Sequence, residues 1–193
     1  MSYETERGSV FLEDARILSQ QAYAGQQFIL KVHAPRAARR AVPGSFAHIA
    51  CDPSVPLRRP LSIMRADAEL GSLEFLYKPR GPGLAKLSAR EVGESLSVLA
   101  PIGHGFTVDA GRPRLLALGG GVGIPPMIFL ADRLRGRPAP KPLVLMGSEV
   151  PFPFELVESQ LPVLGVGQAA THAVARAAHL SGLKPWRAGK RKK

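Results

Sequence analysis

Hydrophobic and polar residues alternate along much of the first hundred residues, and this pattern predicts short β-strands. Over residues 26–34, Phe28, Leu30 and Val32 fall on one face and polar residues such as Lys31 on the other. Alternation of this kind is typical of a strand with one buried face. Further strands are predicted over residues 45–51, 61–65, 73–78 and 95–100. Their spacing fits an antiparallel barrel or sandwich, and no helical period of convincing length precedes Pro101.

The pattern changes in the second half of the chain. Residues 114–136 predict an apolar strand, a glycine-rich turn and an amphipathic helix, and residues 142–148 predict a strand without alternation. An apolar run of that kind suits a parallel sheet covered on both faces. Strand, helix and strand in this order form the βαβ unit of nucleotide-binding domains. Residues 154–161 are expected to begin another helix.

These two patterns divide the chain into three predicted parts, in a fold of the β plus α/β class. An antiparallel β-barrel occupies residues 1–107. An incomplete Rossmann-like nucleotide-binding domain, with two recognisable strands, occupies residues 108–165. A basic tail without fixed structure occupies residues 166–193.

Positive charge is concentrated near the end of the sequence. The 193 residues include 26 Lys and Arg against 15 Asp and Glu, which gives a formal net charge of +11 and a pI of about 10.5. Such values ordinarily suggest a nucleic-acid or anionic-membrane partner. The last acidic residue is Glu158, however, and residues 1–158 carry 19 basic and 15 acidic groups, a net charge of +4. The other +7 belongs to the residues after Glu158, so we expect neither nucleic acid nor a membrane as the main partner.

A single cysteine, Cys51, limits the chemistry and the compartment. It excludes an internal disulfide framework and any metal site built from cysteines of this chain alone, so no bound metal is expected. The first residues lack the apolar region of a signal peptide, and the longest apolar stretch, residues 115–131, contains four glycines and two prolines. We therefore expect a soluble, cytoplasmic protein, and 45% hydrophobic residues are enough for a core.

The sequence GGGVGIPP at residues 119–126 follows a predicted strand and opens a predicted helix. Glycines allow a pyrophosphate to approach the backbone, and the helix N-terminus offers free N–H groups and a positive dipole end. The alternative is a turn that binds nothing, since Pro126 replaces the last glycine of the full G-x-G-x-x-G pattern. Glu149, after the second strand, is either a ribose ligand or a solvated carboxylate.

Three other segments carry candidate chemistry. RRPLSI at residues 58–63 offers two guanidinium groups for bidentate phosphate binding, with Ser62 two residues after the proline, although basic residues at a strand start are often only solvated. PRGPGL at residues 79–84 is either a second phosphate loop, with its own Arg80, or an ordinary hairpin loop. PIGHGF at residues 101–106 joins the two regions, and its histidine is more typical of a linker than of a catalyst.

In this order the four segments resemble the ferredoxin–NADP reductase superfamily, and within it the electron-transfer subunits of type B dihydroorotate dehydrogenases. There RRPLSI, YKxxGxG, PIGxGF and LGGGVGIPPM occur as a set, and the resemblance covers about residues 8–158. It implies a flavin-binding barrel with FAD and NAD(H) as cofactors. It further implies that electrons pass between NAD(H), FAD and an iron–sulfur centre for dihydroorotate/orotate interconversion in pyrimidine biosynthesis. The implied partner is a catalytic dihydroorotate dehydrogenase subunit.

The resemblance also implies a role for each matching residue. Arg59 would bind the FAD pyrophosphate, and Pro60 and Leu61 would shape the wall of the flavin site. Ser62 would take the catalytic position, hydrogen-bonding near flavin N5, where hydride is transferred. The other residues implied to contact a cofactor are Tyr77, Lys78, Gly81 and Gly83 for FAD, and Gly120, Gly121 and Gly123 for the nicotinamide nucleotide.

The sequence departs from the family in two respects. Leu84 stands where the family loop usually carries Thr, which removes one hydroxyl donor to phosphate. The four cysteines that hold the family's [2Fe–2S] cluster are absent, so this chain cannot hold that cluster. Because the tail is free of acidic residues, we expect the chain to be truncated or frame-shifted, diverging from its family between about residues 161 and 178.

Two alternative functions stay open on sequence grounds. A reductase module of a sulfite reductase, hydrogenase or glutamate synthase would have the same fold and similar motifs. A basic module could instead bind nucleic acid or membrane through the tail, and such binding would weaken steeply with salt. Whether the chain is an active oxidoreductase in this form is left open.

Overall fold

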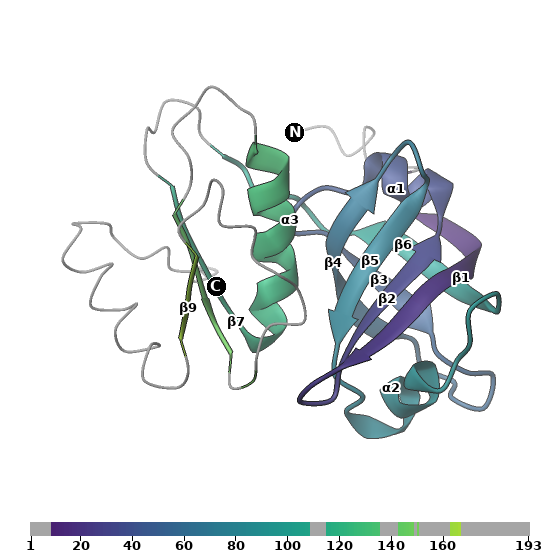
Figure 1. Ribbon diagram of the computed structural model, residues 1–193. Helices are drawn as coiled ribbons and strands as arrows, with labels where there is room; N and C mark the ends of the chain where they lie inside the picture. Colours follow the sequence, from purple (N-terminus) through teal and green to yellow (C-terminus); the bar gives the residue numbers. More distant parts are fainter. Residues whose placement is uncertain (1–8, 109–114, 136–142, 149, 151–162, 167–193) are drawn as a thin grey trace, which may run out of the picture.

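The computed structural model describes residues 9–108, 115–135, 143–148, 150 and 163–166. The first six strands form a closed barrel, and a helix with a small parallel sheet lies beside it (Figure 1). This arrangement confirms the predicted fold class. The barrel strands are β1 (Phe11–Tyr23), β2 (Gln27–His33), β3 (Phe46–Ala50), β4 (Arg59–Asp67), β5 (Ser72–Tyr77) and β6 (Ser95–Ile102). The α/β elements are β7 (Leu116–Gly120), a 3₁₀ turn (Gly121–Gly123), α3 (Ile124–Leu134), β8 (Leu143–Gly147) and β9 (Val163–Val166).

The barrel strands pair antiparallel in the order β1-β2-β5-β4-β3-β6, and β6 pairs with β1 to close the barrel. Leu30 and Val32 of β2 are fully buried, as their alternation with polar residues predicts, and Phe75 of β5 is buried with them. The sequence pattern did not reveal β1, whose register shifts between Ile17 and Ser19 and so breaks the alternation.

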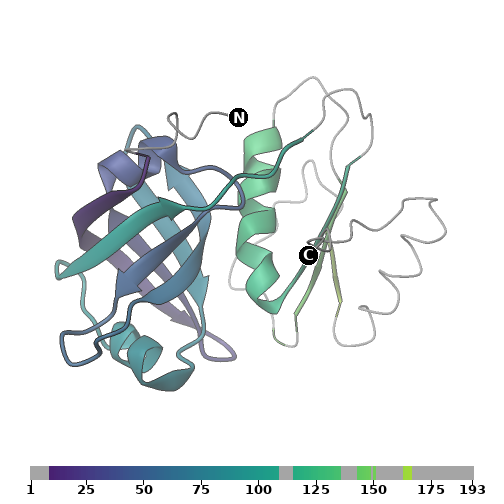
Figure 2. The ribbon, with the colours of Figure 1, turned by 180° about the vertical axis from the view of Figure 1, so that it is seen from behind.

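Two short helices, which the hydrophobic period did not indicate, cover the ends of the barrel. The first, α1 (Pro35–Arg40), lies at one end, and α2 (Gly81–Ser88) lies at the other; Figure 2 shows both from behind. At α1, the Glu13 carboxylate accepts hydrogen bonds from the backbone N–H groups of Arg36 and Ala37, at 3.0 and 2.9 Å. Helices this short have too few turns to show a hydrophobic period.

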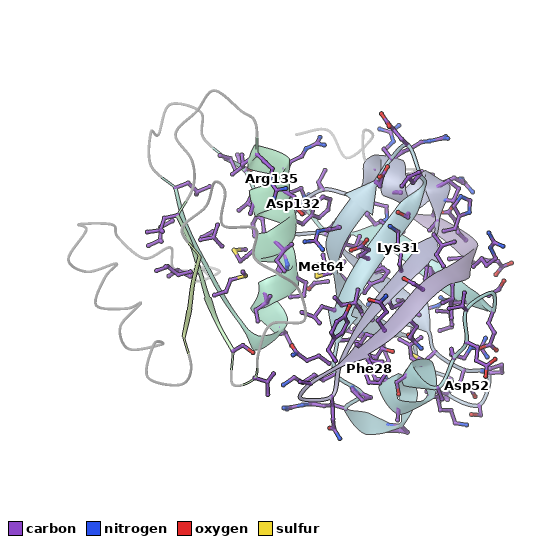
Figure 3. The ribbon with its side chains drawn as sticks, viewed as in Figure 1. Phe28, Lys31, Asp52, Met64, Asp132 and Arg135 are labelled. Carbon is purple, nitrogen blue, oxygen red and sulfur yellow. The ribbon has the colours of Figure 1, made fainter. Side chains whose placement is uncertain are left out.

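The α3 helix lies between the barrel and the parallel sheet (Figures 1 and 2). Met64 of β4 points out of the barrel and is fully buried against a cluster that includes Ile124 and Ile128 of α3 (Figure 3). Beside it, Arg65 Nε lies 2.9 Å from Asp132 Oδ2. An apolar contact and an ion pair therefore join α3 to β4.

The parallel sheet has the order β7-β8-β9. The sequence of β7, α3 and β8 confirms the predicted βαβ unit, and β9 adds a strand to the two that the pattern had indicated. The helix expected over residues 154–161, Glu149 and the tail over residues 167–193 lie outside the described residues. No helix in the described ranges is long and apolar enough to cross a membrane.

Candidate dinucleotide-binding site

Arg59 and Gly83 lie in direct contact at one end of the barrel. Arg59 begins β4, and Gly83 belongs to the first turn of α2. A Cβ atom built on Gly83 would lie 2.7 Å from Arg59 Nε, so any larger residue at position 83 would displace the guanidinium group. The structure thus brings together the two candidate phosphate-binding segments that the sequence presents separately.

The segment expected to be a glycine loop is the N-terminal turn of α2. The helix begins at Gly81, whose φ is +77°, a left-handed conformation that favours glycine. No side chain caps this end of the helix, and its first turn has no acidic residue. Free N–H groups and the positive end of the helix dipole therefore lie beside the Arg59 guanidinium, and such an arrangement attracts a phosphate.

The two arginines of RRPLSI point in different directions. Arg58 Nη1 donates to the Ser97 carbonyl at 2.7 Å, and its Nη2 donates to Ser97 Oγ at 2.8 Å, which ties this segment to β6. Successive side chains of an extended chain point to opposite sides. Of the two arginines, Arg59 is the one that faces α2, and the use of Arg58 in phosphate binding stays a prediction.

Residues of β4 alternate between the inside and the outside of the barrel beyond Arg59. Leu61 is 8% exposed and belongs to the barrel core, while Pro60 is exposed and Ser62 is half-buried. Pro60 lies opposite His48 of β3, and Ser62 lies opposite Phe46. Directly opposite residues share a face of the sheet. The outer surface of these two strands is therefore formed by Phe46, His48, Pro60 and Ser62. The sequence pattern did not single out Phe46 and His48.

Tyr77 is buried rather than open to a ligand. Its side chain is 5% exposed, its ring stacks on Phe28 with centroids 5.6 Å apart, and its hydroxyl donates to Gln20 Oε1 at 3.0 Å. Burial raises the pKa of Tyr77 far above its ordinary value, with a smaller contribution from Cys51 nearby. Tyr77 therefore supports the barrel end on which α2 lies, and Lys78 follows it half-buried.

The second glycine segment lies at the C-terminal end of β7. Gly121 has a φ of +52°, and a Cβ atom at Gly121 or Gly123 would meet no atom within 4 Å, so this turn is open to a ligand. Gly120 is also open, since its nearest contact would be the Gly147 carbonyl at 3.8 Å. Gly119 differs, because its Cβ would lie 2.8 Å from the Gly123 carbonyl oxygen. The N-terminus of α3 lies at the same end of the molecule as α2 (Figures 1 and 2).

The PIGHGF segment has a structural role at the barrel end. Gly103, with a φ of +92°, packs against the ring of Phe46, and the Phe106 N–H donates to the Pro43 carbonyl at 2.9 Å. This segment therefore folds back over the turn that precedes β3. His104, which belongs to the segment, is exposed. Among the described residues, no group of three or more His, Cys, Asp or Glu residues could hold a metal ion.

Comparison with solved structures shows the class of fold. An NADH-dependent reduced ferredoxin-NADP oxidoreductase superposes with a TM-score of 0.72 at 22% identity, covering 85% of this chain and 63% of that one. The ferredoxin reductase in carbazole 1,9a-dioxygenase also has a TM-score of 0.72, at 23% identity, covering 88% of this chain and 57% of its own. The fold is thus that of the ferredoxin reductase-like proteins.

Curated proteins with similar sequences show a more specific resemblance than the fold does. The electron transfer subunit of dihydroorotate dehydrogenase B (NAD(+)) from Geobacillus thermodenitrificans is 37% identical over 131 residues, 65% of this chain and 50% of that protein. The subunit of the same name from Desulforamulus reducens is 34% identical over 125 residues, 63% of this chain and 47% of that protein. The predicted resemblance is confirmed, and the chain spans about half the length of these relatives. No protein-family model matches the chain.

Proposed function

We propose that the chain is an FAD-binding electron-transfer subunit that passes electrons between NAD(H), FAD and an iron–sulfur centre. The observation that carries this proposal is the contact of Arg59 with the first turn of α2, at the start of the strand whose outer face presents Ser62. Its support from relatives is the 37% identity to a subunit whose name specifies electron transfer. The expected reaction context is dihydroorotate/orotate interconversion in pyrimidine biosynthesis, in the cytoplasm.

The residues present fit FAD. Arg59 would hold the pyrophosphate together with the N–H groups of Gly81 and Gly83, and Ser62 would hydrogen-bond the flavin ring. When bound, FAD supplies hydride acceptance from a nicotinamide and release of single electrons. The chain's own contribution is to fix the ring against the outer surface of β3 and β4 and to compensate the charge of the phosphates.

The turn over Gly120, Gly121 and Gly123 fits a nicotinamide nucleotide. Its open backbone follows β7 and precedes α3, so a pyrophosphate would meet free N–H groups at the start of a helix. Pro125 and Pro126, in the first turn of α3, need no hydrogen-bond partner for a backbone N–H. We propose that this turn binds NAD(H) on the side of β4 that α3 covers.

The iron–sulfur centre does not fit this chain. Such a cluster needs four ligands, usually cysteines, and the sequence has only Cys51, which is fully buried in the barrel core. We derive no step through a cluster held here. We propose instead that the electron acceptor is held outside these 193 residues, in an assembly with a catalytic dihydroorotate dehydrogenase subunit.

A reductase module serving a different partner is the second candidate. The observation in its favour is that solved neighbours include a phthalate dioxygenase reductase, at a TM-score of 0.61 and 17% identity. Both candidates require the same flavin site. Mixing the reduced chain with a catalytic dihydroorotate dehydrogenase subunit and a component that holds the iron–sulfur centre separates them, since orotate reduction is expected only for the first.

Purification and visible spectroscopy test the proposed function. We expect the full chain to retain FAD through desalting, to show a flavin absorption spectrum, and to release FAD rather than FMN on denaturation. Anaerobic NADH should then bleach that spectrum. A protein that stays colourless after incubation with FAD would contradict the flavin proposal, and a coloured protein that NADH does not bleach would contradict the nicotinamide proposal.

A further inference from the structure

Gln20 of β1 contacts α2 at the end opposite to its proposed phosphate-binding turn. Its Nε2 donates to the carbonyl oxygens of Leu87 and Arg90, at 2.8 and 2.9 Å. The last carbonyl groups of any helix have no partner within the helix. Both hydrogens of the Gln20 amide are therefore used to satisfy acceptors at and just beyond the C-terminus of α2.

Tyr77 fixes the orientation of the Gln20 side chain. Its hydroxyl donates to Gln20 Oε1 at 3.0 Å, and its ring is held by the stacking on Phe28. A flipped amide would turn the Gln20 oxygen toward two carbonyl oxygens, which cannot donate to it. The Gln20 amide therefore has a single orientation, with its oxygen toward Tyr77 and its nitrogen toward α2.

The α2 helix depends on such contacts from outside. Eight residues are too few for a stable isolated helix. The contacts that locate it include buried Leu87, the Gln20 amide, and a longer ion pair between Lys86 Nζ and Asp52 Oδ1 at 3.8 Å. Because Arg59 contacts Gly83, movement of α2 along its axis would change the distance between the guanidinium group and the helix N–H groups.

We propose that Gln20 is a positioning residue for the FAD phosphates, holding the C-terminus of α2 so that its first turn faces Arg59. This inference rests on the proposed function, since it concerns the phosphates of the flavin bound there. Gln20 does not reach the phosphate-binding turn itself. Its removal should weaken phosphate recognition and leave recognition of the flavin ring intact.

Gln20→Met tests the proposal, because methionine keeps the length of the side chain and removes both amide contacts. We expect the dissociation constant for FAD to rise about tenfold, in line with the loss of two hydrogen bonds, and that for riboflavin, which has no phosphate, to change by less than about twofold. Tyr77→Phe should give a smaller change of the same kind. Gln21→Met is the control, since Gln21 is exposed on the same strand.

Hydrogen exchange of the flavin-free chain gives a second readout that does not depend on ligand binding. In Gln20→Met the amides of α2 should exchange about tenfold faster, while those of β2 and β5 stay unchanged. Unchanged exchange in α2, or equal weakening of FAD and riboflavin binding, would overturn the proposal. Failure of the unmodified chain to bind FAD would contradict the proposed function and the phosphate role together, whereas FAD binding that Gln20→Met leaves unaffected would contradict the Gln20 role alone.

Discussion

The barrel and the α/β part satisfy their backbone groups in different ways. In the barrel, β6 pairs with β1 and each of the six strands has two neighbours, so closure leaves no edge. The described α/β part has β7 and β9 at the ends of its three-stranded sheet, and α3 joins that sheet to the barrel. Leu118 of β7 is 44% exposed, whereas the large side chains inside the barrel are fully buried. The barrel is therefore stabilised by its own interior, whereas the α/β part depends on the contact of α3 with β4.

Phe75→Ala should give the largest effect, because Phe75 is fully buried in the closed barrel. We expect a loss of about 3–5 kcal/mol in the free energy of unfolding, from lost burial and the cavity left behind. Urea unfolding followed by circular dichroism measures it. Phe106→Ala, at a 47% exposed site, should cost less than about 1 kcal/mol. An equal loss of unfolding free energy in the two variants would contradict the claim that buried side chains inside the barrel stabilise it.

Met64→Ala tests the contact between the two regions. Met64 is fully buried outside the barrel, against α3, so we expect a loss of about 2–3 kcal/mol. Hydrogen exchange should become faster in α3 and stay slow in β2, whose Leu30 and Val32 are fully buried inside the barrel. Met64→Leu, with a similar volume, should restore most of the protection. Faster exchange throughout the barrel would show that the two regions are not independent.

Alkaline pH should destabilise the barrel end near α2. The folded chain holds the Tyr77 proton because burial raises its pKa above the ordinary value of 10.0. The unfolded chain releases that proton above about pH 10, so stability is fully present below this pH and falls as pH rises, by at most about 1.4 kcal/mol per pH unit. Urea midpoints from pH 9 to 11 measure the slope. Tyr77→Phe should reduce this dependence of stability on pH. An unchanged slope in the variant would show that other groups cause the loss of stability at alkaline pH.

Arg65→Met should give the smallest effect. Arg65 pairs with Asp132 of α3 and with Glu74 of β5, but 39% of its side chain is exposed. We expect a loss of about 0.5–1 kcal/mol that shrinks in high salt, because solvent screens such pairs. Thermal unfolding at low and high salt measures it, with Arg39→Met, at an exposed position of α1, as a control. A salt-independent loss would show that packing of the side chain, rather than its charge, is what matters.

Alternation predicted most barrel strands, because one face of each lies in the barrel core and the other carries many polar residues, although Met64 on the outer face of β4 is buried against α3. It did not reveal β1, where a bulge interrupts the period, nor α2, whose glycines and proline resemble a turn. The site was predictable only in part. Adjacent Arg58 and Arg59 look equivalent in sequence, yet an extended backbone sends them to opposite sides. Gln20 carries no motif, and its role depends on contacts with residues about 70 positions away.

The central claim is that Arg59 and the first turn of α2 hold the phosphates of FAD. Titration of the flavin-free chain with FAD, followed by quenching of flavin fluorescence, tests it most directly. We expect one FAD per chain, and for Arg59→Ala an affinity lower by about tenfold to a hundredfold, the scale of a charge-assisted phosphate contact. Arg39→Ala, which removes the same charge at the other end of the barrel, should bind as the unmodified chain does. Equal FAD affinity in Arg59→Ala and Arg39→Ala would contradict the claim.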